Sequence, residues 1–122
     1  MIMEIGEIYE SDHLVTEDET AKRIGSGGLP VFSTPSMISL MENVSYLLAE
    51  RHGHQSVGTK VDISHLKACK VGSKVHAVAE LLEIDGRRLR FKVCVTDEAG
   101  VVGEGYHERF MIDPERFMSK LG

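Results

Sequence analysis

The chain has 122 residues, a length that suits one domain with a modest core, and we expect a single domain over residues 1–122. Hydrophobic residues make up 42% and charged residues 27% of the chain, a balance that excludes a disordered protein. The net charge of −5 provides no basic field of the kind that nucleic-acid-binding proteins present, so no nucleic-acid partner is expected.

The cysteines and the apolar segments indicate a compartment. Cys69 and Cys94 fit no zinc or redox spacing, and two unpaired thiols in a small domain are typical of a reducing environment. Residues 1–10 contain three glutamates and lack the apolar centre of a signal peptide. No apolar run approaches the ~18 residues of a membrane-spanning helix. We therefore expect a cytoplasmic protein with no membrane partner.

The part of the chain before the long helix predicts short elements. A strand is expected over residues 6–15. Thr16 and Glu19 have the spacing of a capping box and predict a short helix that ends near Gly25. Three of the four residues from Gly25 to Gly28 are glycine, which predicts a flexible loop.

One long amphipathic helix follows. We expect Thr34 to be its N-cap, Pro35 to occupy its first turn and Gly53 to end it. Its apolar residues recur at spacings of three and four, which gives one broad face able to pack on a sheet. These residues are Met37, Leu40, Met41, Val44, Leu47 and Leu48.

After the helix the apolar period changes to two, which indicates strands. The expected strands cover residues 57–67, 73–84, 88–96 and 101–112, and a short helix is expected over 114–120. Asp85 and Gly86 form a hairpin-turn signal between the second and third of these strands. We expect the four strands to form a meander. The resulting α+β arrangement, a long helix wrapped by a curved antiparallel sheet, is that of the hot-dog fold.

Glu42 and His65 are candidates for acid–base chemistry. Glu42 interrupts a largely apolar stretch of the helix, so it is either a solvated residue of the exposed face or a carboxylate that faces a cleft. His65 is either a surface residue of a strand or a general acid–base, for which its ordinary pKa is well placed.

Thr34 and Gly58 each have a structural and a chemical interpretation. Thr34 either only caps the helix or acts in chemistry beside the free N–H groups of the helix start. Gly58 either marks a bulge or lets a thioester carbonyl approach a backbone N–H. Thr34 and Glu42 lie eight residues apart, which is about 12 Å along a straight helix. Either the helix begins after Thr34, or the two act on different parts of a ligand, or one comes from a partner subunit.

Two further groups of basic residues need an interpretation. His52 and His54 flank Gly53, where a capping role at the helix end is favoured over a metal site. Arg87, Arg88, Arg90 and Lys92 form a basic run around the hairpin. This run is either a solvated strand face or a contact for phosphates.

Four segments resemble the fluoroacetyl-CoA thioesterase-like branch of the hot-dog superfamily. They are, in chain order, Val31–Thr34 with Leu40–Glu42, Val57–Thr59 with Ser64–His65, Gly86–Leu89, and Gly103–Arg109. The first keeps the threonine-to-glutamate spacing of that family, and the second keeps its glycine-to-histidine spacing. No single motif is specific, but the ordered set covers roughly residues 30–112.

The resemblance implies a catalytic set of Thr34, Glu42 and His65, with Gly58 helping to hold the thioester carbonyl. It implies hydrolysis of an acyl-CoA by a homodimer with sites near the subunit interface. No metal and no cofactor besides the coenzyme A of the substrate are expected. In the family the glutamate attacks the thioester or activates water, and the histidine supports proton transfer.

The candidate substrate contacts are Gly58, Arg87, Arg88 and Arg109. The specialised fluoroacetyl enzyme has lid phenylalanines before its threonine, and the matching positions here are Gly25 and Gly28. We therefore expect a more open acyl pocket, bordered by a mobile 25–28 segment, and no fluoroacetate specificity. The alternative function is a non-catalytic acyl-CoA-binding protein, whereas a dehydratase is disfavoured because no Asp and His pair has hydratase spacing on the helix.

Overall fold

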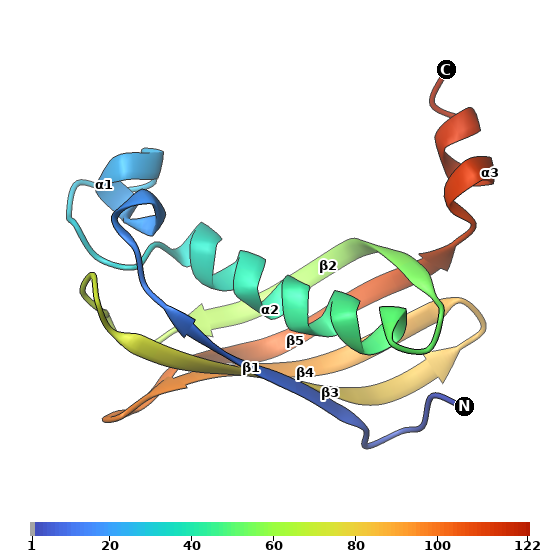
Figure 1. The fold of residues 1–122 in the computed structure, drawn as a ribbon, viewed down its shortest axis with the longest axis horizontal. Coiled ribbons are helices and arrows are strands. Elements are labelled where there is room, and N and C mark those ends of the chain that lie inside the picture. The colour runs from blue at the N-terminus through green and yellow to red at the C-terminus, as the bar shows by residue number, and fades with distance from the viewer. Residues whose placement is uncertain (1) are drawn as a thin grey trace.

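The computed structural model describes residues 2–122, in which a curved antiparallel sheet wraps around one long helix (Figure 1). Helix α2 crosses the concave face of the sheet, and α3 projects from the end of the last strand. The elements are β1 (Ile8–Leu14), the 3₁₀ turn η1 (Glu17–Glu19), α1 (Ala21–Ile24), α2 (Thr34–Glu50), β2 (Gln55–His65), β3 (Lys74–Asp85), β4 (Arg88–Asp97), β5 (Gly100–Ile112) and α3 (Pro114–Ser119). The predicted α+β arrangement is confirmed.

The strand order is β1-β3-β4-β5-β2, and every neighbouring pair is antiparallel. Strands β3, β4 and β5 form the predicted meander. The expectation that β2 joins this meander next to β3 is wrong, because β2 pairs with β5 at the far edge of the sheet. Alternating hydrophobicity identifies a strand but not its neighbour, and the chain crosses the sheet between β2 and β3.

The core lies between α2 and the concave face of the sheet. The helix contributes Met37, Met41, Val44 and Leu48, each at most 2% exposed. Strands β3 and β4 contribute every second residue, whose side chain points toward the helix. These residues are Val75, Ala77, Ala79 and Leu81 on β3, and Leu89, Phe91, Val93 and Val95 on β4. Burial of each large side chain contributes on the order of 2 kcal/mol, so α2 is fixed firmly on the sheet.

The predicted local signals form as expected. The Glu19 carboxylate accepts from the Thr16 backbone N–H at 2.8 Å, which closes the capping box. Gly25 ends α1 with φ of 83°, a left-handed conformation that glycine adopts without strain. Within residues 2–122 no helix is long and apolar enough to cross a membrane.

Candidate functional site

The first turn of α2 pairs a hydroxyl with an imidazole. The N-cap of α2 is Ser33, whose Oγ accepts from the Ser36 N–H at 3.1 Å, so the prediction that Thr34 is the N-cap is wrong. Because Ser33 takes that role, the Thr34 hydroxyl is free, and its Oγ1 lies 2.8 Å from Nδ1 of His65 in a hydrogen bond. Thr34 therefore does not serve as the helix cap. Its hydroxyl contacts His65, which is also a predicted site residue.

His65 ends β2 with one ring nitrogen unused. Its Nε2 is buried and has no hydrogen-bond partner within residues 2–122. A buried polar atom without a hydrogen-bond partner calls for an explanation, and a ligand or a second subunit would supply that partner. Thr34 and His65 also line an open pocket of about 350 Å³. Ser26 lines the same pocket, and both the predicted border between the 25–28 segment and an acyl pocket and the mobility of the segment stay predictions.

Glu42, in the third turn of α2, lies beside Gly58. A Cβ atom at Gly58 would lie only 2.9 Å from Oε2 of Glu42, so any other residue there would displace the carboxylate from the strand. The register of β2 against β5 also shifts between Gly58 and Lys60, which fits the predicted bulge. The Glu42 side chain is 42% exposed, which leaves the carboxylate accessible from solvent.

Arg109, on strand β5, is buried inside the protein. It is 6% exposed, and its guanidinium donates to Oγ of Ser56 at 2.8 Å and to the Ser56 carbonyl at 3.0 Å. Its Nη1 lies 3.9 Å from Oε2 of Glu42. Burial lowers the pKa of Arg109, and the neighbouring Glu42 carboxylate opposes that effect. The predicted substrate contact of Arg109 stays a prediction, whereas its contact with Glu42 is present in the structure.

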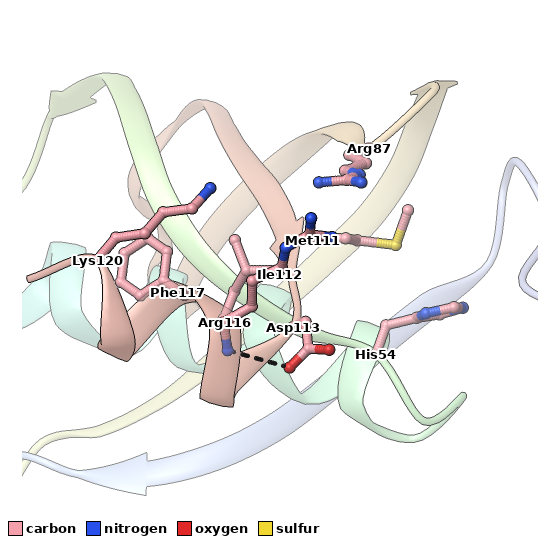
Figure 2. Close-up of a pocket in the computed structure, with 8 residues that line it drawn as sticks. All are labelled: His54, Arg87, Met111, Ile112, Asp113, Arg116, Phe117 and Lys120. Carbon is pink, nitrogen blue, oxygen red and sulfur yellow. Dashed lines mark hydrogen bonds between the residues drawn. The ribbon is translucent and has the colours of Figure 1, made fainter.

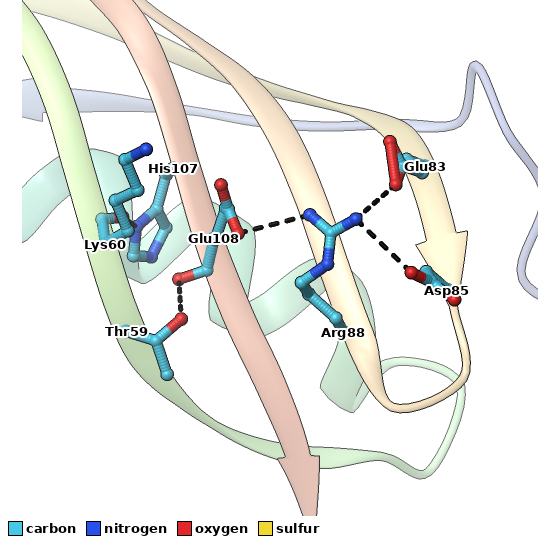
Figure 3. A network of polar contacts seen from close by, with 7 residues as sticks. All are labelled: Thr59, Lys60, Glu83, Asp85, Arg88, His107 and Glu108. Atoms are coloured by element: carbon cyan, nitrogen blue, oxygen red, sulfur yellow. Dashed lines mark hydrogen bonds and ion pairs between the residues drawn. The ribbon is translucent and has the colours of Figure 1, made fainter.

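Arg88 is surrounded by carboxylates (Figure 3). It forms ion pairs with Glu83, with Asp85 at 3.5 Å and with Glu108 at 3.2 Å. Glu108 and then Glu83 raise the pKa of Arg88. Its charge is thus compensated within the sheet, which favours a structural role over a contact with phosphates.

Arg87 has the opposite environment. It lines a pocket of about 320 Å³ beside α3, together with the cationic side chains of Arg116 and Lys120 and an apolar wall that includes Phe117 (Figure 2). None of these three cations forms an ion pair with another part of residues 2–122. Among the candidate substrate contacts Arg87, Arg88 and Arg109, Arg87 is the one that forms no ion pair within residues 2–122.

The separation of Thr34 from Glu42 is that of a continuous helix. Because α2 begins at Thr34 and runs through Glu42, the alternative in which the helix starts later is excluded. Eight residues rise by about 12 Å, so the Thr34–His65 pair and the Glu42–Gly58 pair are two halves of a site that one chain does not bring together. Action on different parts of a ligand and contribution from a partner subunit both remain.

His52 and His54, at the end of α2, show no sign of a shared metal site. His52 is 2% exposed on its side chain and bonds through Nε2 to the carboxylate of Glu7, which differs from the predicted capping of the helix end. This contact and that of Arg51 lower the pKa of Glu7 to about 2. Within residues 2–122 no group of three or more histidine, cysteine, aspartate or glutamate side chains is arranged to hold a metal ion.

Sequence reasoning missed His107, which is 1% exposed and lies next to the carboxylate site. Its Nδ1 is 2.8 Å from the Lys60 carbonyl, and its Nε2 is 3.2 Å from Nη1 of Arg109. Burial lowers the pKa of His107, which favours the neutral ring. The signal was present in the alternation of β5, which places His107 and Arg109 on the same face.

The chain is similar to known fluoroacetyl-CoA thioesterases in sequence and in fold. The family model described as fluoroacetyl-CoA-specific thioesterase (FlK) matches residues 15–115. Fluoroacetyl-CoA thioesterase from Streptantibioticus cattleyicolor is 31% identical over 128 residues, which span 98% of this chain and 92% of that protein. A solved structure of a fluoroacetyl-CoA thioesterase has a TM-score of 0.92 at 31% identity, covering 99% of this chain and 96% of the other.

Two further solved structures extend the comparison. A threonine-to-serine variant of the fluoroacetyl-CoA enzyme in complex with acetyl-CoA has a TM-score of 0.92 at 30% identity, covering 98% of this chain and 96% of the other. A hot-dog-like protein from Thermanaerovibrio acidaminovorans has a TM-score of 0.86 at 18% identity, covering 96% of this chain and 89% of the other. The hot-dog fold expected from the sequence is confirmed.

Proposed function

This chain belongs to the fluoroacetyl-CoA-specific thioesterase family, and from that premise we propose that it hydrolyses an acyl-CoA thioester to a free acid and coenzyme A. The observation that carries the proposal is the pair of contacts in this chain, Thr34 with His65 and Glu42 over Gly58. Together they provide a carboxylate, an imidazole, a hydroxyl and a close backbone approach, which are the groups that thioester hydrolysis requires.

In the proposed reaction Glu42 either attacks the thioester carbonyl carbon or activates the water that does. The oxyanion that forms is stabilised by the Gly58 backbone N–H, a contribution of about 3 kcal/mol for one donor. With the Thr34 hydroxyl accepting from Nδ1–H of His65, the lone pair of Nε2, which has no partner within residues 2–122, is free to take up the proton that water gives up. As the carbon–sulfur bond breaks, Nε2 returns this proton to the leaving thiolate, and the water supplies the hydroxyl group of the acid.

The two halves of the site support a homodimer. Strand β2 pairs only with β5 within residues 2–122, so its outer edge is open to a second copy. Residues 58–64 of β2 are exposed apart from Ile63, and Val61 lies at their middle. An antiparallel pair of β2 strands with its two-fold axis at Val61 would set Gly58 opposite Ser64 of the partner subunit. The Glu42 carboxylate would then lie beside His65 of the partner subunit.

Different residues are proposed to contact the acyl part and the nucleotide part of the substrate. Glycines at 25 and 28 favour an acyl pocket without an aromatic lid, and thus a substrate other than fluoroacetyl-CoA. The uncompensated charge of Arg87, with Arg116 and Lys120 in the same pocket, favours contact with the phosphates of coenzyme A. Because Arg88 is already engaged in ion pairs, we assign it a structural role in the hairpin beside that pocket.

The proposed reaction uses no metal and no further cofactor, since the side chains supply both nucleophile activation and proton transfer. Unchanged activity in the presence of EDTA is the expected result. A cytoplasmic location is also part of the proposal, supported by the free thiols of Cys69 and Cys94.

The experiment that tests the function is thiol release from a panel of acyl-CoAs of increasing chain length. Glu42→Gln keeps the shape of the side chain and removes its charge, so we expect kcat to fall about 10²-fold or more while the protein still folds. Glu98→Gln, the same change in an exposed turn, is the matched control. Wild-type kcat in Glu42→Gln would overturn the assignment, and acyl-CoA binding without hydrolysis by the wild-type protein would favour a binding protein.

A further inference from the structure

We propose that Arg109 and His107 are a buried positioning pair that holds the Glu42 carboxylate against Gly58. The inference rests on the proposed function, because it concerns the carboxylate that acts there. Three side chains converge on the space above Gly58. A Cβ atom there would lie 2.9 Å from Oε2 of Glu42, 3.2 Å from Cε1 of His107 and 3.4 Å from Nη1 of Arg109.

The guanidinium of Arg109 is held rigidly from the side away from Glu42. Its Nε donates to Oγ of Ser56 at 2.8 Å, and its Nη2 donates to the Ser56 carbonyl at 3.0 Å. Both contacts go to the strand that carries Gly58, two residues further along. The planar group therefore has a fixed orientation relative to Gly58, and a guanidinium loses little freedom when it donates in this forked geometry.

His107 fixes the remaining nitrogen. Its Nδ1 lies 2.8 Å from the Lys60 carbonyl, which can only accept, so Nδ1 carries the proton. The lone pair of Nε2 is then available to accept from Nη1 of Arg109 at 3.2 Å. The chain of donors thus runs from Arg109 to His107 and from His107 to Lys60, and the neutral imidazole adds no charge that would compete with Glu42.

The charge of Arg109 explains why the pair points at Glu42. Burying a guanidinium is costly unless a carboxylate compensates it. Within residues 2–122, Glu42 is the one carboxylate that forms an ion pair with Arg109, at 3.9 Å. The Tyr46 ring, 5.8 Å from the guanidinium carbon, covers another side. An internal cation whose carboxylate partner is 42% exposed on its side chain is suited to orienting that partner for an incoming ligand.

The test is a double-mutant cycle between Arg109→Met and Glu42→Gln, with kcat and KM measured on the best acyl-CoA of the panel. Arg109→Met keeps the length and apolar body of the side chain. We expect it to lower kcat about 10- to 10²-fold with little change in KM, since misplacement of a catalytic group costs that much. In the Glu42→Gln background the same substitution should leave the residual kcat unchanged. A purely structural role would lower kcat equally in both backgrounds.

Further variants keep the test decisive. Arg109→Lys restores a cation without the forked contacts and should recover part of the kcat lost in Arg109→Met. Ser56→Ala removes one anchor of the guanidinium and serves if Arg109→Met fails to fold; we expect it to lower kcat several-fold, and only while Glu42 is present. Arg23→Met, an exposed position on α1, is the matched control.

Equal losses in both backgrounds, or wild-type kcat in a folded Arg109→Met, would overturn the positioning role. Failure of the proposed function has a different signature, which is wild-type kcat in Glu42→Gln alone.

Discussion

At the scale of single residues, two adjacent hydroxyls at the start of α2 have different contacts and should have different mutant phenotypes. Ser33 caps the helix and Thr34 bonds to His65. We expect Ser33→Ala to lower the free energy of unfolding by about 1 kcal/mol with little effect on kcat. Thr34→Ala should lower kcat about tenfold, less than Glu42→Gln, with a smaller effect on stability. Urea denaturation and steady-state kinetics of both variants make the comparison.

The outcome that contradicts this division is a Thr34→Ala variant with a stability loss matching that of Ser33→Ala and an unchanged kcat. Thr34 would then be part of the helix start alone. Thr34→Ser is the conservative control, because it keeps the hydroxyl that contacts His65.

Residue types and spacings identified the candidates, but not their partners. Thr34, Glu42, Gly58 and His65 were all selected from the sequence, and they do form two close pairs. The identity of the helix cap was misassigned by one residue, because serine and threonine are both good caps and stand side by side. Arg109 was predicted as a substrate contact. Its burial was not predicted, because arginine is rarely buried and its partner Glu42 lies far away in the sequence.

At the scale of elements, the N-terminal segment is tied to the end of α2 by Glu7. Its carboxylate accepts from Arg51 at 2.6 Å and bonds to His52, and its pKa falls to about 2 from an ordinary 4.5. A depressed carboxyl pKa means that the folded state gains stability above pH 4.5, and that this gain disappears as pH falls toward 2. Glu7→Gln should therefore destabilise the protein at neutral pH, by about 1 kcal/mol after allowance for solvent screening.

Thermal melts at several pH values measure this effect. The melting temperatures of wild type and Glu7→Gln should differ at pH 7 and converge in acid. A constant difference across the pH range would mean that the packing of the side chain, and not its charge, holds the segment.

Helix α3 and the β3–β4 hairpin together form the proposed phosphate contact, and a change of substrate isolates it. Replacing Arg116 and Lys120 by alanine should raise KM for acyl-CoA about tenfold or more, because two charge-assisted contacts to phosphate are lost. KM for the matching acyl-pantetheine, which lacks the nucleotide phosphates, should stay the same. Lys22→Ala on α1 is the control for a general change of charge. An equal rise in KM for both substrates would exclude a phosphate contact.

The elements themselves were predictable because local signals decide them. The capping box, the hairpin turn and the alternation of β4 each depend on neighbouring residues, and each forms. The turn is Gly86–Arg87, one residue later than predicted, and the short helix is divided into η1 and α1, with Thr20 as the N-cap of α1. The position of β2 at the far edge depends on how α2 lies across the sheet. That arrangement is set by tertiary packing of the whole helix face, which a periodic pattern does not encode.

At the scale of the whole molecule, the 12 Å rise between Thr34 and Glu42 makes the composition of the active site testable by mixing two inactive variants. Glu42→Gln lacks the carboxylate and His65→Ala lacks the imidazole. In a mixed dimer with shared sites, one site combines the intact Glu42 of one subunit with the intact His65 of the other. Random exchange makes about half of the dimers mixed, each with one working site of two, so about a quarter of wild-type activity should return.

The alternative, in which each chain uses its own residues, predicts a different result from the same mixture. Every site of a mixed dimer then carries one of the two substitutions, and mixing restores nothing. Light scattering at micromolar concentration should first establish a dimer, and subunit exchange should be verified with a mass-tagged variant. Restored activity would require Glu42 to act with His65 of the partner subunit. It would also explain why the buried Nε2 of His65 has no hydrogen-bond partner among residues 2–122 of its own subunit. A monomer in solution would remove the basis for the shared site and leave the two halves to act on separate parts of the acyl-CoA.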